Sequence, residues 1–451
     1  MKVQKDKSHY LFDNKALTAL IVPLIIEQFL AVLVGMADSI MIASVGEAAV
    51  SGVSLVDQVM LLIINLFGAL ATGGAVVAGQ YLGRKKLEEA DKAANQLVWF
   101  ITILAMGVMA VVYLGKDLIL HGVFGQIEAD VMGHANTYLL IVTASIPFIA
   151  LYNGGAAIFR TMGNSKITMI VSLIMNAINV IGNAILIYGF HCGTEGVAIP
   201  TLISRVIAAI LITVLLLNEK QVLHLQKTLR YRPNKETIKK ILGIGIPNGL
   251  ENSMFQLGKI LVLSLVSTFG TYAIAANAVS NVVASFQILP GMALSLAVTT
   301  VISRCVGAKD YEQVSYYTKK LLAISYVCIF VTNAIIYFAL PLIMRAYNLS
   351  AKTAEVTEQI LIFHSISCIV IWTIAFTLPS TLRAAGDAKV SMIISVLSMW
   401  IFRIGFSYIL GKYFGWGVFG VWVAMVIDWV FRAILFVIRY CGGKWKEIRT
   451  I

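Results

Sequence analysis

The stretch from residue 16 to residue 42 reads ALTALIVPLIIEQFLAVLVGMADSIMI, and it decides the class of the protein. Glu27 and Asp38 are its only charged residues, and a helix needs about 20 apolar residues to cross a bilayer. Similar segments recur along the 451 residues, of which 59% are hydrophobic and 13% charged, against about 25% charged in a typical soluble domain. Hydropathy therefore predicts an all-α integral membrane protein with twelve transmembrane helices, near residues 16–42, 54–79, 95–115, 137–159, 168–190, 196–217, 241–268, 273–300, 321–344, 360–382, 391–411 and 416–438.

The first 15 residues are polar and basic and run straight into the first span. That span is too long for a signal-peptide core and lacks a small-residue cleavage pattern, so we expect a retained helix.

The formal charge of +12 is distributed unevenly among the predicted loops. With a cytoplasmic N-terminus, the inner segments hold 27 Lys and Arg residues, whereas the outer loops hold only Lys116, Arg345, Lys352 and Lys412. This asymmetry follows the positive-inside rule. It explains the basic charge without nucleic acid, and it predicts that both termini are cytoplasmic. The five cysteines are scattered without the spacing of metal ligands.

The chain contains an internal repeat. Shifting the sequence by 224 residues aligns Pro23 with Pro247, Glu27 with Glu251 and Gly83 with Gly307, and a shift of 223 aligns RTMGNSK at 160–166 with RAAGDAK at 383–389. The polar connection 218–240 stands between the two copies. We therefore expect an N-terminal lobe (1–217) and a C-terminal lobe (241–451) of six helices each, joined by a cytoplasmic linker around a central cavity, as in transporters built from parallel repeats.

Charged and amide side chains inside the first lobe are the first candidates for a site, because charges within a span are expensive and usually functional. Glu27 and Asp38 lie within roughly 20° of one helix face and about 16 Å apart in height. Asn176, Asn179 and Asn183 form a stripe on the fifth span. Such a stripe either ties helices together or supplies oxygen ligands to a cation such as Na⁺. Further candidates are Asn153 and Thr201.

The second lobe carries different buried groups. Val262 stands at the position of Asp38, and Phe402 and Phe406 stand at those of Asn179 and Asn183. Its charged candidates are Glu251, Lys259 and Arg403. Glu251 and Lys259 are about 80° apart around their helix, which disfavours a direct pair. Lys259 is therefore expected to meet a carboxylate of another helix or a ligand.

Other polar groups favour structural readings. Asp428 and Arg432 have the i, i+4 spacing of a helix-stabilising pair, and the glycines between 68 and 83 suit close helix packing. His364 is either a proton carrier or a hydrogen-bonded core residue. The sequence offers no nucleophile–base pair, metal cluster or nucleotide loop, so no enzyme and no cofactor are expected. A membrane acyltransferase would need a catalytic dyad that the sequence lacks.

Several motifs together resemble the multidrug and toxic compound extrusion (MATE) family of the MOP flippase superfamily. They are PLIIEQFLAVLVGMADSIMIASVG, VAGQYLGRKK, RTMGNSK, NAINVIGNAILIYG, IAANAVSNVVASF, LRAAGDAK and MWIFRIGFSYIL. The resemblance covers nearly the whole chain and is nearest to the bacterial DNA-damage-inducible F-like branch. It implies a monomeric antiporter that exports small organic compounds or drugs in exchange for H⁺ or Na⁺.

The resemblance also implies a cation site in the first lobe. Asp38 matches the family's first-helix aspartate, and Asn153, Asn179 and Thr201 match its polar partners. The usual fifth-helix aspartate is replaced by Asn183, which leaves one carboxylate and favours H⁺ over Na⁺. Glu251 matches a seventh-helix glutamate of some members, whose tenth-helix aspartates are missing here.

The sequence leaves three functions open, namely export of drugs or other organic compounds, export of a specific neutral or anionic metabolite, and flipping of lipid-linked precursors. Lys259 and Arg403 disfavour a purely cation-selective cavity, so the substrate of an exporter could be neutral, zwitterionic or anionic. A flippase of lipid-linked precursors from the same superfamily is the alternative, and it would require a strongly basic cavity.

Overall fold

A computed structural model describes residues 10–125, 127–227 and 231–451. The first residues of the basic N-terminal tail and residues 228–230 of the predicted linker lie outside this part. The described residues form helices and no β-strand, as predicted. The first seven α-helices are α1 (Asn14–Ala43), α2 (Glu47–Gly83), α3 (Leu87–Leu114), α4 (Ala129–Thr143), α5 (Ile146–Thr161), α6 (Ser165–Ala184) and α7 (Glu195–Leu216). The next seven are α8 (Lys235–Ser267), α9 (Thr271–Gly307), α10 (Tyr311–Tyr347), α11 (Ala351–Ser367), α12 (Leu378–Ala384), α13 (Ala388–Ser398) and α14 (Gly417–Cys441).

Short π-helical segments extend or join several of these helices. They are η1 (Leu118–Val123), η2 (Ile185–Gly189), η3 (Cys368–Thr377), η4 (Met399–Ile404) and η5 (Ser407–Tyr413), and a 3-10 turn, η6 (Lys444–Glu447), follows α14. As a result, α11, η3 and α12 form one span over Ala351–Ala384. In the same way α13, η4 and η5 form one over Ala388–Tyr413.

The predicted spans correspond to these helices. Ten helices in the described part are long and apolar enough to cross a membrane, and the pair α4 and α5, bent by 49°, makes an eleventh. The remaining helix, α8, is long enough at 33 residues but carries Asn248, Glu251 and Lys259 along its length. Large apolar side chains such as Leu114 (89% exposed) and Phe338 (80% exposed) face outward, as expected where lipid is the solvent.

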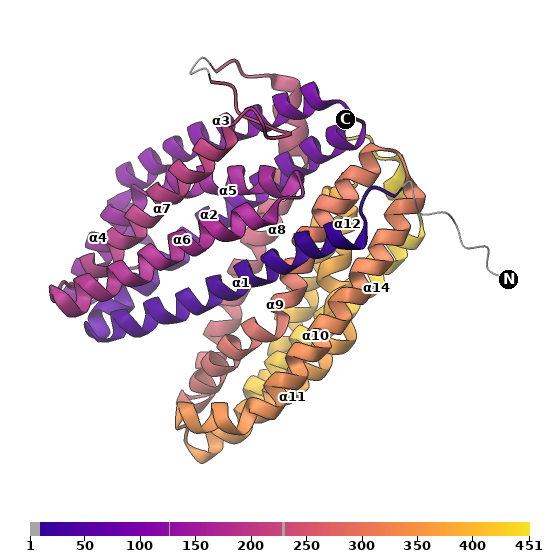
Figure 1. Cartoon of the computed structure of the whole chain (residues 1–451). Helices are drawn as coiled ribbons and strands as arrows, with labels where there is room; N and C mark the ends of the chain where they lie inside the picture. Colours follow the sequence, from indigo (N-terminus) through magenta and orange to yellow (C-terminus); the bar gives the residue numbers. More distant parts are fainter. Residues whose placement is uncertain (1–9, 126, 228–230) are drawn as a thin grey trace.

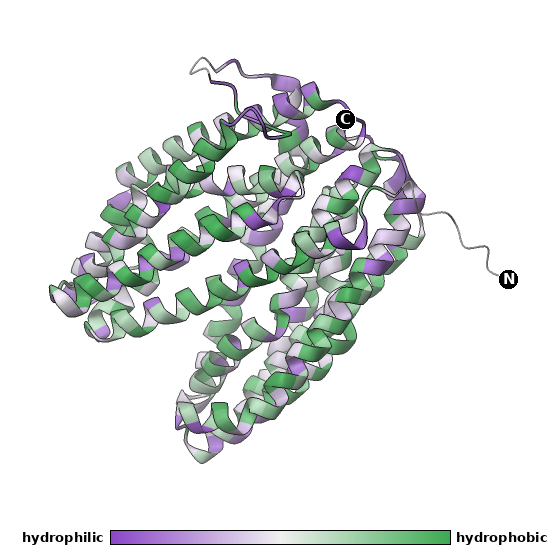
Figure 2. Cartoon of the chain, viewed as in Figure 1, coloured by the Kyte–Doolittle hydropathy of each residue, from purple (hydrophilic) through white to green (hydrophobic). Residues whose placement is uncertain are grey.

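The two groups of helices meet at one end of the molecule and diverge toward the other (Figure 1). We call the meeting end the termini end, because the described N-terminal residues, the connection between α7 and α8, and the C-terminus lie there. Hydrophilic residues gather at this end, and hydrophobic ones run along the helices (Figure 2).

The backbone repeats its unusual turns at the offsets found in the sequence. Residues with positive φ recur in equivalent loops: Gly46 (143°) and Gly270 (105°), Lys85 (59°) and Lys309 (57°), and Gly163 (85°) and Gly386 (98°). The repeat therefore extends from residue identity to loop conformation.

The lobes touch where α2 crosses α9 at the termini end. A Cβ atom on Gly83 would lie 2.0 Å from the backbone oxygen of Arg304, and one on Gly307 would lie 2.0 Å from that of Gln80. These two contacts are equivalent under the 224-residue shift. Glycine is therefore required on both helices for this approach.

Side chains reinforce the crossing with the same symmetry. Gln80 donates to the carbonyl of Ala384 at 2.9 Å, and Arg304 donates to the carbonyl of Thr161 at 2.7 Å. The N-terminal segment adds a third link, because the backbone N–H of Phe12 donates to the Tyr317 hydroxyl at 3.0 Å. The termini end is thus closed by contacts between the lobes.

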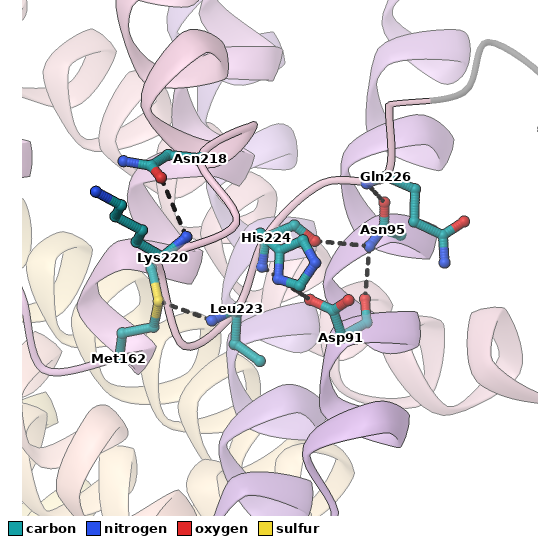
Figure 3. Close-up of polar contacts among 8 residues, drawn as sticks. All are labelled: Asp91, Asn95, Met162, Asn218, Lys220, Leu223, His224 and Gln226. Carbon is teal, nitrogen blue, oxygen red and sulfur yellow. Dashed lines mark hydrogen bonds and ion pairs between the residues drawn. The ribbon is translucent and has the colours of Figure 1, made fainter.

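The connection between the lobes is fixed to the first lobe (Figure 3). The backbone N–H of His224 donates to Asp91 at 2.8 Å, and that of Gln226 donates to Asn95 at 2.9 Å. Asn95 in turn donates to the carbonyl of His224 at 3.0 Å. Because α8 begins at Lys235, residues 235–240 of the predicted linker are helical.

Candidate functional site

Four of the predicted cation-site residues come together inside the first lobe. Asn183 on α6 donates to the Asp38 carboxylate at 2.6 Å. In the amide orientation that satisfies both of its neighbours, Asn179 donates to Asp38 at 2.8 Å and accepts from Thr201 at 3.0 Å. Asn179 and Asn183 are one helical turn apart, so both amides reach α1 from the same face of α6.

This cluster is largely withdrawn from solvent. Asn183 is fully buried, Asn179 and Thr201 are buried, and Asp38 is half-buried. The side-chain oxygen of Asn183 has no hydrogen-bond partner among the described residues. The cluster thus combines a carboxylate with a free amide oxygen, two groups that hard cations or protons use.

The other two polar candidates of this lobe lie apart from the cluster. Asn153 on α5 is half-buried, and in the described structure it makes no hydrogen bond to Asp38, Asn179 or Asn183. Asn176 donates at 3.4 Å to the hydroxyl of Ser172 on its own helix. Of the asparagine stripe, Asn179 and Asn183 alone bond to the carboxylate.

The structure adds three residues that the sequence analysis missed: Asp57 on α2, Tyr138 on α4 and Arg205 on α7. Tyr138 donates to the Asp57 carboxylate at 2.9 Å, and Arg205 donates to the hydroxyl of Ser145 at 2.8 Å. The charges of Asp57 and Arg205 both act on Asp38. Asp57 adds a second acidic group whose charge acts on Asp38, although its own hydrogen bond is to Tyr138 rather than to a member of the cluster. Asp57 and Arg205 could have been found from the sequence, because each is a charged residue inside a predicted span, 54–79 or 196–217.

Glu27 and Glu251, predicted as a buried acid and a cavity residue, form equivalent pairs in the two lobes. Glu27 lies 3.4 Å from the guanidinium of Arg160 and accepts from Thr168 at 2.9 Å. Glu251 lies 3.3 Å from the guanidinium of Arg383. Each pair joins the first helix of its lobe, α1 or α8, to the last turn of another helix, α5 or α12. Both glutamates therefore tie two helices together.

Lys259 and Arg403 do not pair with Glu251. The Lys259 ammonium lies 5.0 Å from the centre of the Phe255 ring, and the Arg403 guanidinium lies 5.1 Å from the same centre. Neither cation has a carboxylate within 4 Å in the described chain. Arg403 is only 9% exposed, and its Nε has no hydrogen-bond partner there.

Two other polar groups of the second lobe are structural. Asp428 lies 3.6 Å from Arg432 and accepts from Ser398 at 2.6 Å, so this pair ties α14 to α13. His364 is buried, bonds to Gln287 at 2.5 Å and packs its ring against Trp422. This geometry favours the hydrogen-bonded reading of His364. Among the described residues no group of three His, Cys, Asp or Glu side chains could hold a metal.

Comparison with known proteins places the chain in a family. The MatE family model matches residues 23–185 and 247–409. The uncharacterized transporter YisQ of Bacillus subtilis is 28% identical over 99% of this chain and 97% of its own length. The probable multidrug resistance protein NorM of Thermotoga maritima is 26% identical over 96% of this chain and 93% of its own. A solved outward-facing MATE family transporter of the MOP superfamily superposes with a TM-score of 0.89 at 22% identity, covering 96% of this chain and 97% of that one. The chain belongs to the MATE family of multidrug efflux transporters.

Proposed function

We propose that this protein is a secondary active antiporter that exports small organic compounds in exchange for a monovalent cation. One observation carries the proposal: the half-buried Asp38 carboxylate accepts hydrogen bonds from Asn179 and Asn183 inside the first lobe. A carboxylate placed in this way can take up and release a cation as solvent reaches it. Alternating access would then couple that cycle to movement of the lobes.

The arrangement of the lobes supports an outward-open state. The basic loops gather at the termini end, which we assign to the cytoplasm on the positive-inside rule. The lobes are closed there by the glycine contacts of α2 and α9. A cation that enters from the outer side would meet Asp38 in this state. We also expect a single chain to suffice as the working unit, in the bacterial cytoplasmic membrane, without nucleic acid.

We infer H⁺ as the coupling ion ahead of Na⁺. Asn179 and Asn183 present N–H groups to Asp38 rather than oxygens, so a sodium ion at Asp38 would require an amide to rotate. The positive charge of Arg205 acts on the same carboxylate, and it would repel a sodium ion bound there. A proton needs no such ligand set.

The energy of the membrane potential is sufficient for export. A potential of about 150 mV gives one monovalent cation roughly 3.5 kcal/mol. At 1.4 kcal/mol per tenfold ratio, one-for-one exchange sustains a substrate gradient on the order of 300-fold.

The decisive experiment is transport in proteoliposomes with separately imposed H⁺ and Na⁺ gradients and a panel of substrates. Asp38→Asn should abolish gradient-driven export while leaving the protein folded. Asp130→Asn, which changes an exposed acid of the same lobe, should leave export intact. Normal export by a stable Asp38→Asn variant would overturn the proposal.

The flippase alternative is less well supported. It calls for a strongly basic interior, and Lys259 and Arg403 favour it. However, Asp38 and Asp57 offset the positive charge of Arg205 in the first lobe. Movement of a labelled lipid-linked precursor, unaffected by Asp38→Asn, would favour the flippase.

A further inference from the structure

Lys259 and Arg403 converge on one aromatic ring in the second lobe. Their charged groups lie 5.0 Å and 5.1 Å from the centre of the Phe255 ring. Lys259 belongs to α8 and Arg403 to η4, so the meeting depends on the packing of two spans. Gly258 lies against η4 at this point, because a Cβ atom there would lie 2.1 Å from Cε of the flexible Met399 side chain.

Three other arginines of this lobe lie beside carboxylates, and a fourth, Arg304, donates to the carbonyl of Thr161. Arg383 lies beside Glu251, Arg432 beside Asp428, and Arg439 lies 2.7 Å from Asp387. Arg403 is as deeply buried, yet it has no carboxylate within 4 Å among residues 10–125, 127–227 and 231–451. A buried charge without a carboxylate in contact is costly, and Asp428 acts on Arg403 only from beyond ion-pair distance. An external anion bound at Arg403 would lower that cost.

The position of the two cations relates them to the transport pathway. Lys259 lies three residues before Val262, the equivalent of Asp38, so it sits at nearly the same depth as the acidic cluster of the other lobe. Its side chain is exposed, whereas Arg403 is buried. The two cations and the Phe255 ring thus combine an accessible ammonium, a buried guanidinium with a free Nε–H and an aromatic face.

We propose that Lys259, Arg403 and Phe255 form a binding site for the anionic group of a soluble aromatic organic acid, such as a carboxylate, sulfonate or phosphate monoester. This inference rests on the proposed export function and names its substrate class. Lys259 supplies attraction at the entrance. Arg403 supplies directional hydrogen bonds to the anion, and Phe255 packs against the apolar body of the ligand.

Equilibrium binding of phenyl phosphate to the purified full-length protein in phosphatidylcholine nanodiscs tests the site, with benzyl alcohol as a neutral probe. We expect phenyl phosphate to bind the wild type more tightly than benzyl alcohol. Lys259→Gln and Arg403→Gln should each weaken it by about 10- to 100-fold, the effect of one charge-assisted hydrogen bond. Lys259→Arg should restore binding. Lys352→Gln removes another exposed lysine over an aromatic ring of this lobe and should have no effect.

Equal binding of the two probes, or unchanged phenyl phosphate binding in Lys259→Gln, would overturn the inference. Addition of phosphatidylglycerol tests a lipid headgroup as the occupant, and full competition by this lipid would also overturn it. The Asp38→Asn variant separates the two proposals, because it should lose export and still bind phenyl phosphate. If the wild type binds phenyl phosphate no more tightly than benzyl alcohol but still exports other compounds, the anion site is refuted and the export function stands.

Discussion

Replacing Gly307 by alanine should open the termini end of the molecule. The added Cβ would lie 2.0 Å from the Gln80 carbonyl oxygen, whereas ordinary contact begins at 3.4 Å, so α2 and α9 must separate by about 1.4 Å. Overpacking of this kind costs typically 1–3 kcal/mol. That cost applies to the closed state alone, and it corresponds to about a 5- to 150-fold shift toward the open state.

Spin labels on the exposed residues Glu88 and Lys319, one on each lobe at the termini end, would report the shift in a cysteine-free background. The distance distribution should gain a longer component in Gly307→Ala. Gly83→Ala should behave alike, because its Cβ meets the Arg304 carbonyl at the same 2.0 Å. The matched control is Gly68→Ala, on α2, where nothing lies within 4 Å. Unchanged distances in both crossing variants, with normal export, would refute the assignment of this crossing as the inner closure.

Three further predictions concern the paired charges and the connection. Glu251→Gln should lower the free energy of unfolding by up to about 3 kcal/mol, because it leaves the largely buried Arg383 without its carboxylate. Thermal unfolding in detergent measures this loss. Arg205→Gln removes the positive charge that acts on the acidic cluster and should strengthen Na⁺ binding by about tenfold, measured as Na⁺-driven export. Asp91→Ala deletes the acceptor of the His224 N–H and should increase tryptic cleavage of the connection by about tenfold.

Matched variants give each of these predictions a control. Glu358→Gln changes an exposed acid of the second lobe and should not alter unfolding. Lys116→Gln removes a cation of the same lobe that is not among the charges acting on Asp38 and should not create Na⁺ dependence. Glu88→Ala, an exposed neighbour of Asp91 on α3, should not affect cleavage. A stability loss, Na⁺ response or cleavage rate in the test variant equal to that of its control would contradict the corresponding prediction.

Local patterns in the sequence determined the spans, the repeat and the core of the cation cluster. Apolar run length depends on composition alone, and helical spacing places Asn179 and Asn183 on one face without knowledge of their neighbours. The family resemblance then linked this face to Asp38 and Thr201. The structure brings these four residues together.

Asp57 escaped the sequence analysis for a physical reason. It lies near the start of the predicted span 54–79, where a charge reads as an interfacial residue. Only the packing of α2 against α4 brings it to the Tyr138 hydroxyl, and only the position of α7 brings Arg205 near both acids. Periodicity along one helix carries no information about which other helix it meets.

The sequence by itself determined that two related sets of apolar helices span a membrane. Each span satisfies its own backbone hydrogen bonds and needs only its own apolar length to enter lipid. The tertiary structure decided which buried charges are neutralised. Glu27 and Glu251 pair with arginines 133 and 132 residues away, whereas Arg403 has no carboxylate within 4 Å among the described residues. These ion pairs join different helices and form only when the packed helices bring the charged groups within a few ångströms. The sequence repeat does not show which groups come that close.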